Sequence, residues 1–256
     1  MMRFRSLGSG SGGNATVIES RSGGRTSRVV VDCGFSLKEF ESRLARAGAT
    51  PTDIDAVFIT HEHGDHIGCA VSLARRHAIP LWMSRGTWRA IGEPDLGPLL
   101  CFARDGAAIS VGALELHPYT VAHDAAEPLQ LRVSDGAATL GILTDAGSIT
   151  AHLLANLQGC NALLLECNHD RNLLAASRYP PSLKVRIGGD YGHLANDTAA
   201  QILEAVMHAG LKHVVAAHLS EQNNRIELVR EALLPMCGDE EVVVANPVRG
   251  TPWLGI

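Results

Sequence analysis

Four side chains with metal-binding chemistry lie close together in the segment 61–66. They are His61, His63, Asp65 and His66, and a chain of this composition contains such an H-x-H-x-D-H pattern by chance about once in a thousand cases. His61 and His63 point to the same side of an extended segment, whereas Asp65 and His66 follow where we expect a turn into a helix. Imidazole and carboxylate groups suit Zn²⁺, Mn²⁺ or Fe. The segment therefore predicts a metal centre; the alternative is a polar turn with solvated histidines.

These four side chains cannot complete two catalytic metal sites, so more distant ligands are required. The best candidates are polar residues that directly follow apolar, strand-like segments, because layered α/β folds place their sites at the ends of strands. Three residues have this position: His123 after 116–121, Asp145 after 140–144 and His218 after 214–217. The alternative for each is an ordinary loop residue.

The elements that must position these residues alternate along the chain in two β-rich halves. Strands are predicted at 28–32, 56–60, 162–166, 213–217 and 241–245, with another ending near Ile187; helices are predicted at 67–77, 148–157, 197–209 and 221–234. Two sheets packed face to face, with helices outside, satisfy this pattern. No linker separates the halves, so we expect one domain over residues 1–256.

The composition is that of a globular chain that needs neither disulfides nor a membrane. Hydrophobic residues make up 46% of the 256 residues and charged residues 19%, enough for a sizeable core. The net charge of −5 argues against a passive coat on nucleic acid, although a nuclease needs only a local positive site. The six cysteines form no C-x-x-C pair, and no long apolar stretch is present. We therefore expect a reduced, cytoplasmic protein with no membrane contact.

The motifs resemble those of the metallo-β-lactamase superfamily of metal-dependent hydrolases. The resemblance implies a four-layer αβ/βα sandwich of two mixed β-sheets that binds two divalent ions, Zn²⁺, Mn²⁺ or Fe. It implies one ion held by His61, His63 and His123, a second held by Asp65, His66 and His218, and Asp145 as the bridge. Some lactamases carry Cys at that position, so its carboxylate resembles the phosphodiesterase and thioesterase members.

The closer resemblance is to the YycJ/WalJ-type, exonuclease-like branch of that superfamily. It is carried by SGSGGNA (9–15), VDCG (31–34), THEHGDHIG (60–68), ECNHD (166–170), GHLAN (192–196) and HLSEQNN (218–224). The last three stretches are more specific than the metal motif, which belongs to the whole superfamily. The resemblance implies an exonuclease or other phosphodiesterase whose substrate is the end of a DNA or RNA strand.

Phosphodiester cleavage requires a nucleophile and a proton for the leaving oxygen. Two nearby ions lower the pKa of a bridging water, which supplies hydroxide, and Asp65 is expected to be catalytic through the second ion. His193 is the candidate proton donor, since it lies in a glycine-flanked loop before a helix. It resembles the Gly-His-Ser-Thr histidine of members that process transfer RNA. The alternative is a histidine that caps the helix.

Further polar residues are candidates for binding the substrate phosphate. Ser220, Asn223 and Asn224 follow His218 and could donate neutral hydrogen bonds, with helix capping as the alternative. His169 either lines the site or caps a helix, and Asp32 at a strand end is expected to support a ligand imidazole. The basic residues expected around the mouth are Arg85, Arg89, Arg104, Arg171, Arg178, Lys184 and Arg186.

Three other functions compete with the nuclease. One is a small-molecule phosphodiesterase acting on cyclic or nucleotide-like esters, and another is a metal-stabilised binding protein. A third is a glyoxalase-II-like thioester hydrolase, which would need a basic C-terminal patch, whereas the segment 237–241 is acidic. The oligomeric state, monomer or homodimer, is left open.

Overall fold

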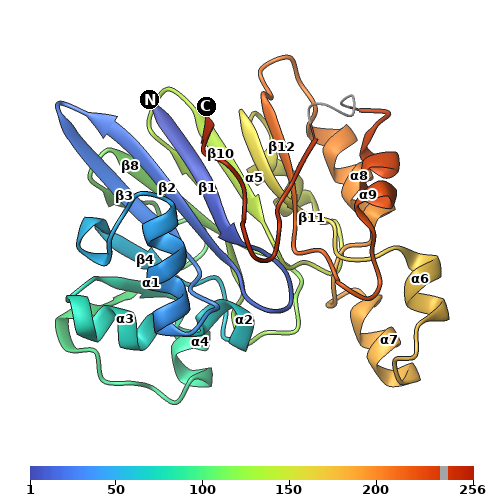
Figure 1. Cartoon of the computed structure of the whole chain (residues 1–256), viewed down its shortest axis with the longest axis horizontal. Helices are drawn as coiled ribbons and strands as arrows, with labels where there is room; N and C mark the ends of the chain where they lie inside the picture. The colour runs from blue at the N-terminus through green and yellow to red at the C-terminus, as the bar shows by residue number, and fades with distance from the viewer. Residues whose placement is uncertain (237–241) are drawn as a thin grey trace.

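Two β-sheets lie side by side at the centre of the computed structural model, which describes residues 1–236 and 242–256 (Figure 1). The first sheet begins with antiparallel pairs and continues with parallel ones from β3 onward. Its order is β14 (Leu254–Gly255), β1 (Met2–Gly8), β2 (Ala15–Ser22), β3 (Arg25–Val31), β4 (Ala56–Phe58), β5 (Leu81–Met83) and β6 (Leu100–Phe102).

The second sheet is also mixed. Its order is β13 (Val242–Val244), β12 (His213–Ala217), β11 (Ala162–Glu166), β10 (Thr139–Leu143), β9 (Leu129–Ser134), β8 (Leu114–Thr120) and β7 (Ile109–Val111). The strands from β10 to β13 are parallel, whereas β7 to β10 pair antiparallel. The carboxyl ends of β10, β11 and β12 therefore meet at one edge, where side chains that follow them can converge.

Apolar residues fill three layers between and outside the sheets. Phe4 and Phe58 from the first sheet pack against Leu131 from the second in the central core. Helices α1 (Leu37–Arg46) and α3 (Ala70–His77) cover the outer face of the first sheet, and α5 (Ala151–Leu157), α8 (Asn196–Val206) and α9 (Ile226–Leu233) cover that of the second. This αβ/βα sandwich confirms the predicted fold class. The other helical segments are η1 (Pro51–Asp53), α2 (Gly64–Ile67), α4 (Arg85–Ala90), η2 (Gly97–Leu99), α6 (Arg171–Ala176) and α7 (Pro181–Ile187).

The strands predicted at 162–166 and 213–217 have the expected bounds, and those predicted at 28–32 and 56–60 differ by up to three residues at an end. Two predicted helices differ more. The helix predicted at 67–77 is divided into α2 and α3 at Gly68, which has a φ of 29°. A Cβ at Gly68 would lie 2.3 Å from the carbonyl oxygen of Cys33, so only glycine permits this close approach. The helix predicted at 221–234 begins only at Ile226, after the turn that follows His218.

The strand predicted to end near Ile187 is wrong, because these residues form the helix α7. Leu183, Val185 and Ile187 alternate with polar residues, which is typical of a strand. However, Pro181 occupies the first turn of the helix, where its fixed φ favours helix initiation. Val185 is 74% exposed, so the alternation does not correspond to one buried face.

Two sequence-based predictions involve residues 237–241. The acidic segment 237–241 and the first residue of the strand predicted at 241–245 lie outside the described residues, and β13 covers 242–244. In the part of the chain that the structure describes, no helix is long and apolar enough to cross a membrane.

Candidate metal centre

The end of β4 and the short helix α2 position the four motif residues. A loop of a few residues connects β4 to α2 and holds His61, while His63 is the residue directly before the first turn of α2. Asp65 and His66 lie within α2, so their side chains leave the backbone in other directions than those of the two preceding histidines. The expected turn into a helix is therefore present, and it divides the motif into two pairs.

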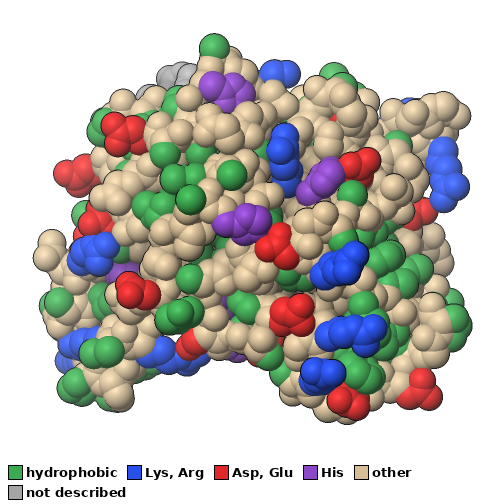
Figure 2. All heavy atoms as spheres, turned by 180° about the vertical axis from the view of Figure 1, so that it is seen from behind, with side chains coloured by type: hydrophobic (Ala, Val, Ile, Leu, Met, Phe, Trp, Pro, Cys, Tyr) green, Lys and Arg blue, Asp and Glu red, His purple; other side chains and the backbone are tan. Residues whose placement is uncertain are grey.

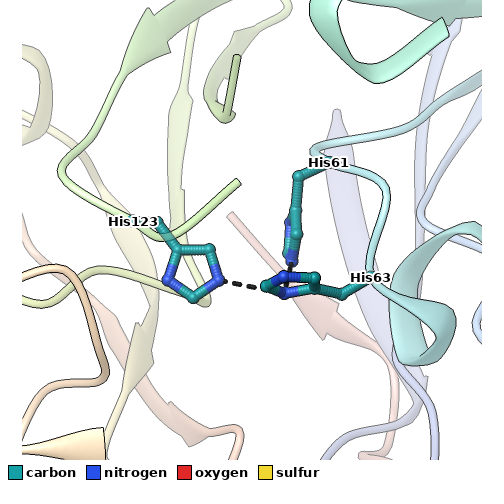
Figure 3. Close-up of side chains that lie close together, drawn as sticks. All are labelled: His61, His63 and His123. Carbon is teal, nitrogen blue, oxygen red and sulfur yellow. Dashed lines mark hydrogen bonds between the residues drawn. The ribbon is translucent and has the colours of Figure 1, made fainter. Parts of the chain in front are cut away.

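Three imidazole rings converge from two loops to form the first group (Figure 3). Nε2 of His61 lies 3.0 Å from Nδ1 of His63, and Nε2 of His123 lies 3.2 Å from that same Nδ1. His123 follows β8 and belongs to the second sheet, whereas the other two follow β4 of the first. Nitrogens that bind one ion at about 2.1 Å are themselves about 3 Å apart. The three rings therefore fit one divalent ion.

A second group of metal-binding type adjoins the first. It contains Asp65, His66 and His218, and Nε2 of His218 lies 3.2 Å from Oδ2 of Asp65. Asp145, which follows β10, has one oxygen 2.7 Å from Nε2 of His66 and the other 3.3 Å from Nδ1 of His218. Asp145 also groups with His61 and His66. The structure thus brings His123, Asp145 and His218 to the motif.

Buried hydrogen bonds orient the candidate ligands. Oδ2 of Asp32 lies 2.8 Å from Nδ1 of His66, which leaves Nε2 of that ring for the metal group. Asp32 also accepts hydrogen bonds from the amide and hydroxyl of Thr60. The backbone at Asp32 and His218 is left-handed, with φ of 62° and 54°. The expectation that Asp32 supports a ligand imidazole agrees with these contacts.

Glu166 is a site residue that sequence reasoning missed. It is fully buried at the end of β11, and its Oε1 lies 2.8 Å from Nδ1 of His193 and 3.3 Å from Nδ1 of His218. Its other oxygen accepts hydrogen bonds from the amides of Ala146 and Leu194. The signal available in the sequence was the polar residue at the end of a predicted strand, the same signal that selected Asp145.

The two groups open to solvent through a hollow between two lobes of the molecule. The cavity has a volume of about 320 Å³ and is lined by Ser11, His63, Asp65, Asp145, Arg186, His193 and His218. Figure 2, seen from behind, shows histidine side chains within a notch at the lower edge, beside the lower-left lobe that contains α6 and α7. His193 therefore shares a solvent-accessible cavity with residues of both metal groups.

Comparison with known proteins agrees with the resemblance to the metallo-β-lactamase superfamily. The family described as "Beta-lactamase superfamily domain" matches residues 27–219. Exodeoxyribonuclease YycJ of Bacillus anthracis is 34% identical over 233 residues, which are 90% of this chain and 86% of that protein. Exodeoxyribonuclease WalJ of Streptococcus pneumoniae (strain D39) is 31% identical, and the match covers 98% of this chain and 96% of that protein. The chain belongs to the β-lactamase superfamily.

Solved structures share the fold at low sequence identity. The metallo-β-lactamase fold protein YhfI of Bacillus subtilis superposes with a TM-score of 0.76 at 18% identity, and both chains are covered completely. Zn²⁺-bound PqqB of Methylobacterium extorquens gives a TM-score of 0.73 at 14% identity, again over both full chains. This member of the superfamily is a metal-dependent hydrolase, and its His and Asp groups fit divalent metal ions.

Burial and neighbouring charges set the ionisation of the site. Burial, reinforced by the neighbouring His66, holds the pKa of His61 well below its usual value. Burial also disfavours charge on His218, but Asp145 and the hydrogen bonds to Asp65 and Glu166 outweigh it and raise the pKa to about 9. Burial alone would raise the pKa of Asp145, yet the His218 and His66 imidazoliums hold it well below its usual range. The carboxylate thus stays ionised, as a metal ligand must, whereas His66 and His218 must release a proton when an ion binds.

The four predicted substrate contacts do not line the cavity. Asn224 is held by Asn196 and the carbonyl of Cys167, and the hydroxyl of Ser220 accepts a hydrogen bond from the amide of Asn223. The Asn223 side chain and both ring nitrogens of His169 are buried without a hydrogen-bond partner among the described residues. Their role as substrate contacts stays a prediction.

Proposed function

We propose that the chain is a dinuclear metal-dependent exonuclease that acts on the ends of DNA or RNA strands. The observation that carries the proposal is the pair of adjoining ligand groups at a solvent-open cavity, with Asp145 beside His61 of the first group and beside His66 and His218 of the second. A structural site would be closed by its ligands, whereas this one leaves room for a reacting group. Two relatives that span most of the chain are named exodeoxyribonucleases, which supports DNA as the substrate.

Seven side chains would hold the two ions. When bound, the ions would lower the pKa of a water molecule and stabilise negative charge on the phosphoryl oxygens. The first ion would bind His61, His63 and His123, the second would bind Asp65, His66 and His218, and Asp145 would contact both.

In this proposal, His193 donates a proton to the leaving oxygen. Its Nδ1 lies 2.8 Å from Glu166 and 2.9 Å from Asp145, so these carboxylates hold the Nδ1 proton and fix the ring. Its Nε2 has no hydrogen-bond partner in the described part of the chain and can carry the transferred proton. His193 is 21% exposed within the cavity, which allows a substrate to approach it.

The substrate class can be tested with end-labelled oligonucleotides. Single-stranded DNA and RNA incubated with the Mn²⁺-loaded protein should release mononucleotides, and the rate should fall steeply as salt rises. Bis-nitrophenyl phosphate serves as the small-molecule comparison. If the loaded protein cleaves that diester but leaves every oligonucleotide intact, the small-molecule phosphodiesterase is correct and the exonuclease proposal is wrong.

A further inference from the structure

Of the seven basic residues predicted around the mouth of the metal cavity, Arg186 is the one that lines it. Three of the others are engaged elsewhere: Arg171 pairs with Asp197, Lys184 donates to the carbonyl of Ala175, and Arg85 stacks on Phe102. In the described part of the chain, every other side chain that lines the cavity is a histidine, a carboxylate or Ser11. Arg186 is therefore positioned to supply the local positive charge that an anionic substrate requires.

Asp124 orients the Arg186 guanidinium. The Nε group of Arg186 donates a hydrogen bond to Oδ2 of Asp124, while Oδ1 of Asp124 lies 3.6 Å from Nε2 of His123. The backbone amide of Asp124 donates to the carbonyl of Tyr191, in the loop that follows α7. The carboxylate thus connects the last turn of α7 to the loop of a candidate metal ligand, so the guanidinium is fixed relative to the metal groups.

The terminal nitrogens of Arg186 are left for a ligand. Nη1 and Nη2 have no hydrogen-bond partner among the described residues, and the side chain is 57% exposed. A guanidinium bound through Nε presents these two nitrogens as a fork, which matches two oxygens of one phosphate. A phosphodiester carries two such non-bridging oxygens, and a carboxylate offers a similar pair, so the free edge fits an anion with two paired oxygens.

We propose that Arg186 binds the non-bridging oxygens of a substrate phosphate beside the metal centre, with Asp124 as its positioning residue. This inference rests on the proposed phosphodiester-cleaving function. Arg186 then distinguishes an anionic diester from a neutral ester or thioester that offers no such pair of oxygens. The competing explanation is that the Arg186–Asp124 pair only fastens the loop 188–193.

Binding to the metal-free protein separates the two explanations. Anisotropy of a labelled single-stranded oligonucleotide gives the Kd as a function of salt for wild type, Arg186→Gln, Arg186→Lys and Asp124→Asn. Arg186→Gln should weaken binding about tenfold or more and make the slope of log K against log salt shallower by about 0.7, the value for one phosphate contact on a single strand. Arg186→Lys and Asp124→Asn should weaken binding but keep the slope, because the charge remains.

Arg21→Gln is the matched control. Arg21 is exposed near the end of β2, at the opposite end of that strand from the turn near the site, and the substitution removes the same charge. It should leave affinity and slope unchanged. The proposal is wrong if Arg186→Gln has the affinity and the slope of wild type and changes only the melting temperature or metal content. In that case the Arg186–Asp124 pair only stabilises the loop 188–193.

A failure of the proposed function is recognised separately. If wild type itself neither binds nor cleaves any oligonucleotide, bis-nitrophenyl phosphate becomes the probe. A raised KM for that diester in Arg186→Gln, relative to Arg21→Gln, would support phosphate binding by Arg186. An unchanged KM would overturn it.

Discussion

Asp65 combines a structural backbone with a functional side chain. Its carbonyl oxygen accepts a hydrogen bond from the amide of Asn14, whereas its carboxylate contacts His218 in the second metal group. Asp65→Ala keeps the backbone contact and removes only the ligand, so we expect hydrolysis to be abolished while the protein stays folded. Activity and thermal melting measured on the same sample check this, and a collapsed melt would mean that the metal is structural.

The loss of rate on replacing His193 should be larger for a leaving group that needs a proton than for one that leaves unprotonated. Loss of a general acid costs roughly 10²–10⁴-fold in rate for a sugar alkoxide but little for nitrophenolate, which leaves unprotonated. His193→Ala is therefore assayed on an oligonucleotide and on bis-nitrophenyl phosphate, with metal content checked. An equal loss on both substrates would assign His193 to binding or to loop structure.

His169 should make the fold sensitive to acid. Burial lowers its pKa to about 4, compared with about 6.5 in the unfolded chain. Between these values the unfolded state binds a proton that the folded state does not, so stability falls as pH falls through this window. At pH 5 the free energy of unfolding should have dropped by about 2 kcal/mol from this group. Urea unfolding of wild type and His169→Gln at pH 7.5 and pH 5 isolates the effect, because the other histidines are common to both. Equal losses in the two proteins would contradict it.

At the scale of elements, the loop after α7 forms one wall of the site. The carbonyl of Gly192 lies 3.0 Å from Nδ1 of His123, and the next residue is His193. A Cβ at Gly192 would lie 2.2 Å from the carbonyl oxygens of Arg186 and Ile187. Gly192→Ala must therefore displace the loop, and a shift of about 1 Å at a site costs on the order of 10² in rate.

The neighbouring Gly188 provides the control for this substitution. An added Cβ there meets its nearest atoms at 3.4 and 3.5 Å, which is ordinary contact. We expect Gly188→Ala to retain most activity while Gly192→Ala loses it at similar melting temperature. If both variants keep full kcat/KM, the loop does not need its present position.

The sequence predicted strands better than it predicted the segments between them. Runs such as Val29–Val30–Val31 are buried on both faces, so their β-branched character follows directly from the sheet. In α7, Val185 is exposed, and the sequence alone did not show that the alternating residues lie on a short solvent-facing helix. The local pattern there reflects neither a buried face nor a strand.

Candidate ligands could be predicted where they lie in a local motif or directly after an apolar strand. Contacts between side chains from different strands could not be predicted in this way. His61 to His66 form a local motif, and His123, Asp145 and His218 each end an apolar strand. Glu166 has the same position, but its contacts with His193 and His218 depend on the parallel pairing of β10, β11 and β12. Such tertiary contacts between strands are not marked by any regular spacing of residues in the sequence.

At the scale of the whole molecule, the core should hold the fold without metal. Three apolar layers bury residues from both sheets and from five helices, and none of them includes the metal groups. A chelator should therefore eliminate hydrolysis but leave a cooperative thermal transition. Binding at a thousandfold excess over Kd adds about 4 kcal/mol, so the transition should move down by about 10 °C. Loss of the transition in differential scanning calorimetry would show that folding requires the ions.

At Asp32 and His218, the backbone conformation lowers the stability of the fold, whereas the side chain supports or belongs to the metal groups. Each left-handed, non-glycine backbone costs about 1 kcal/mol or more. A glycine at either position would relieve that backbone cost, but it would also remove the buried contacts of Asp32 with Thr60 and His66, or that of His218 with Asp65. An alanine would remove the same contacts and keep the backbone cost. At both positions the glycine variant should therefore be more stable than the alanine variant.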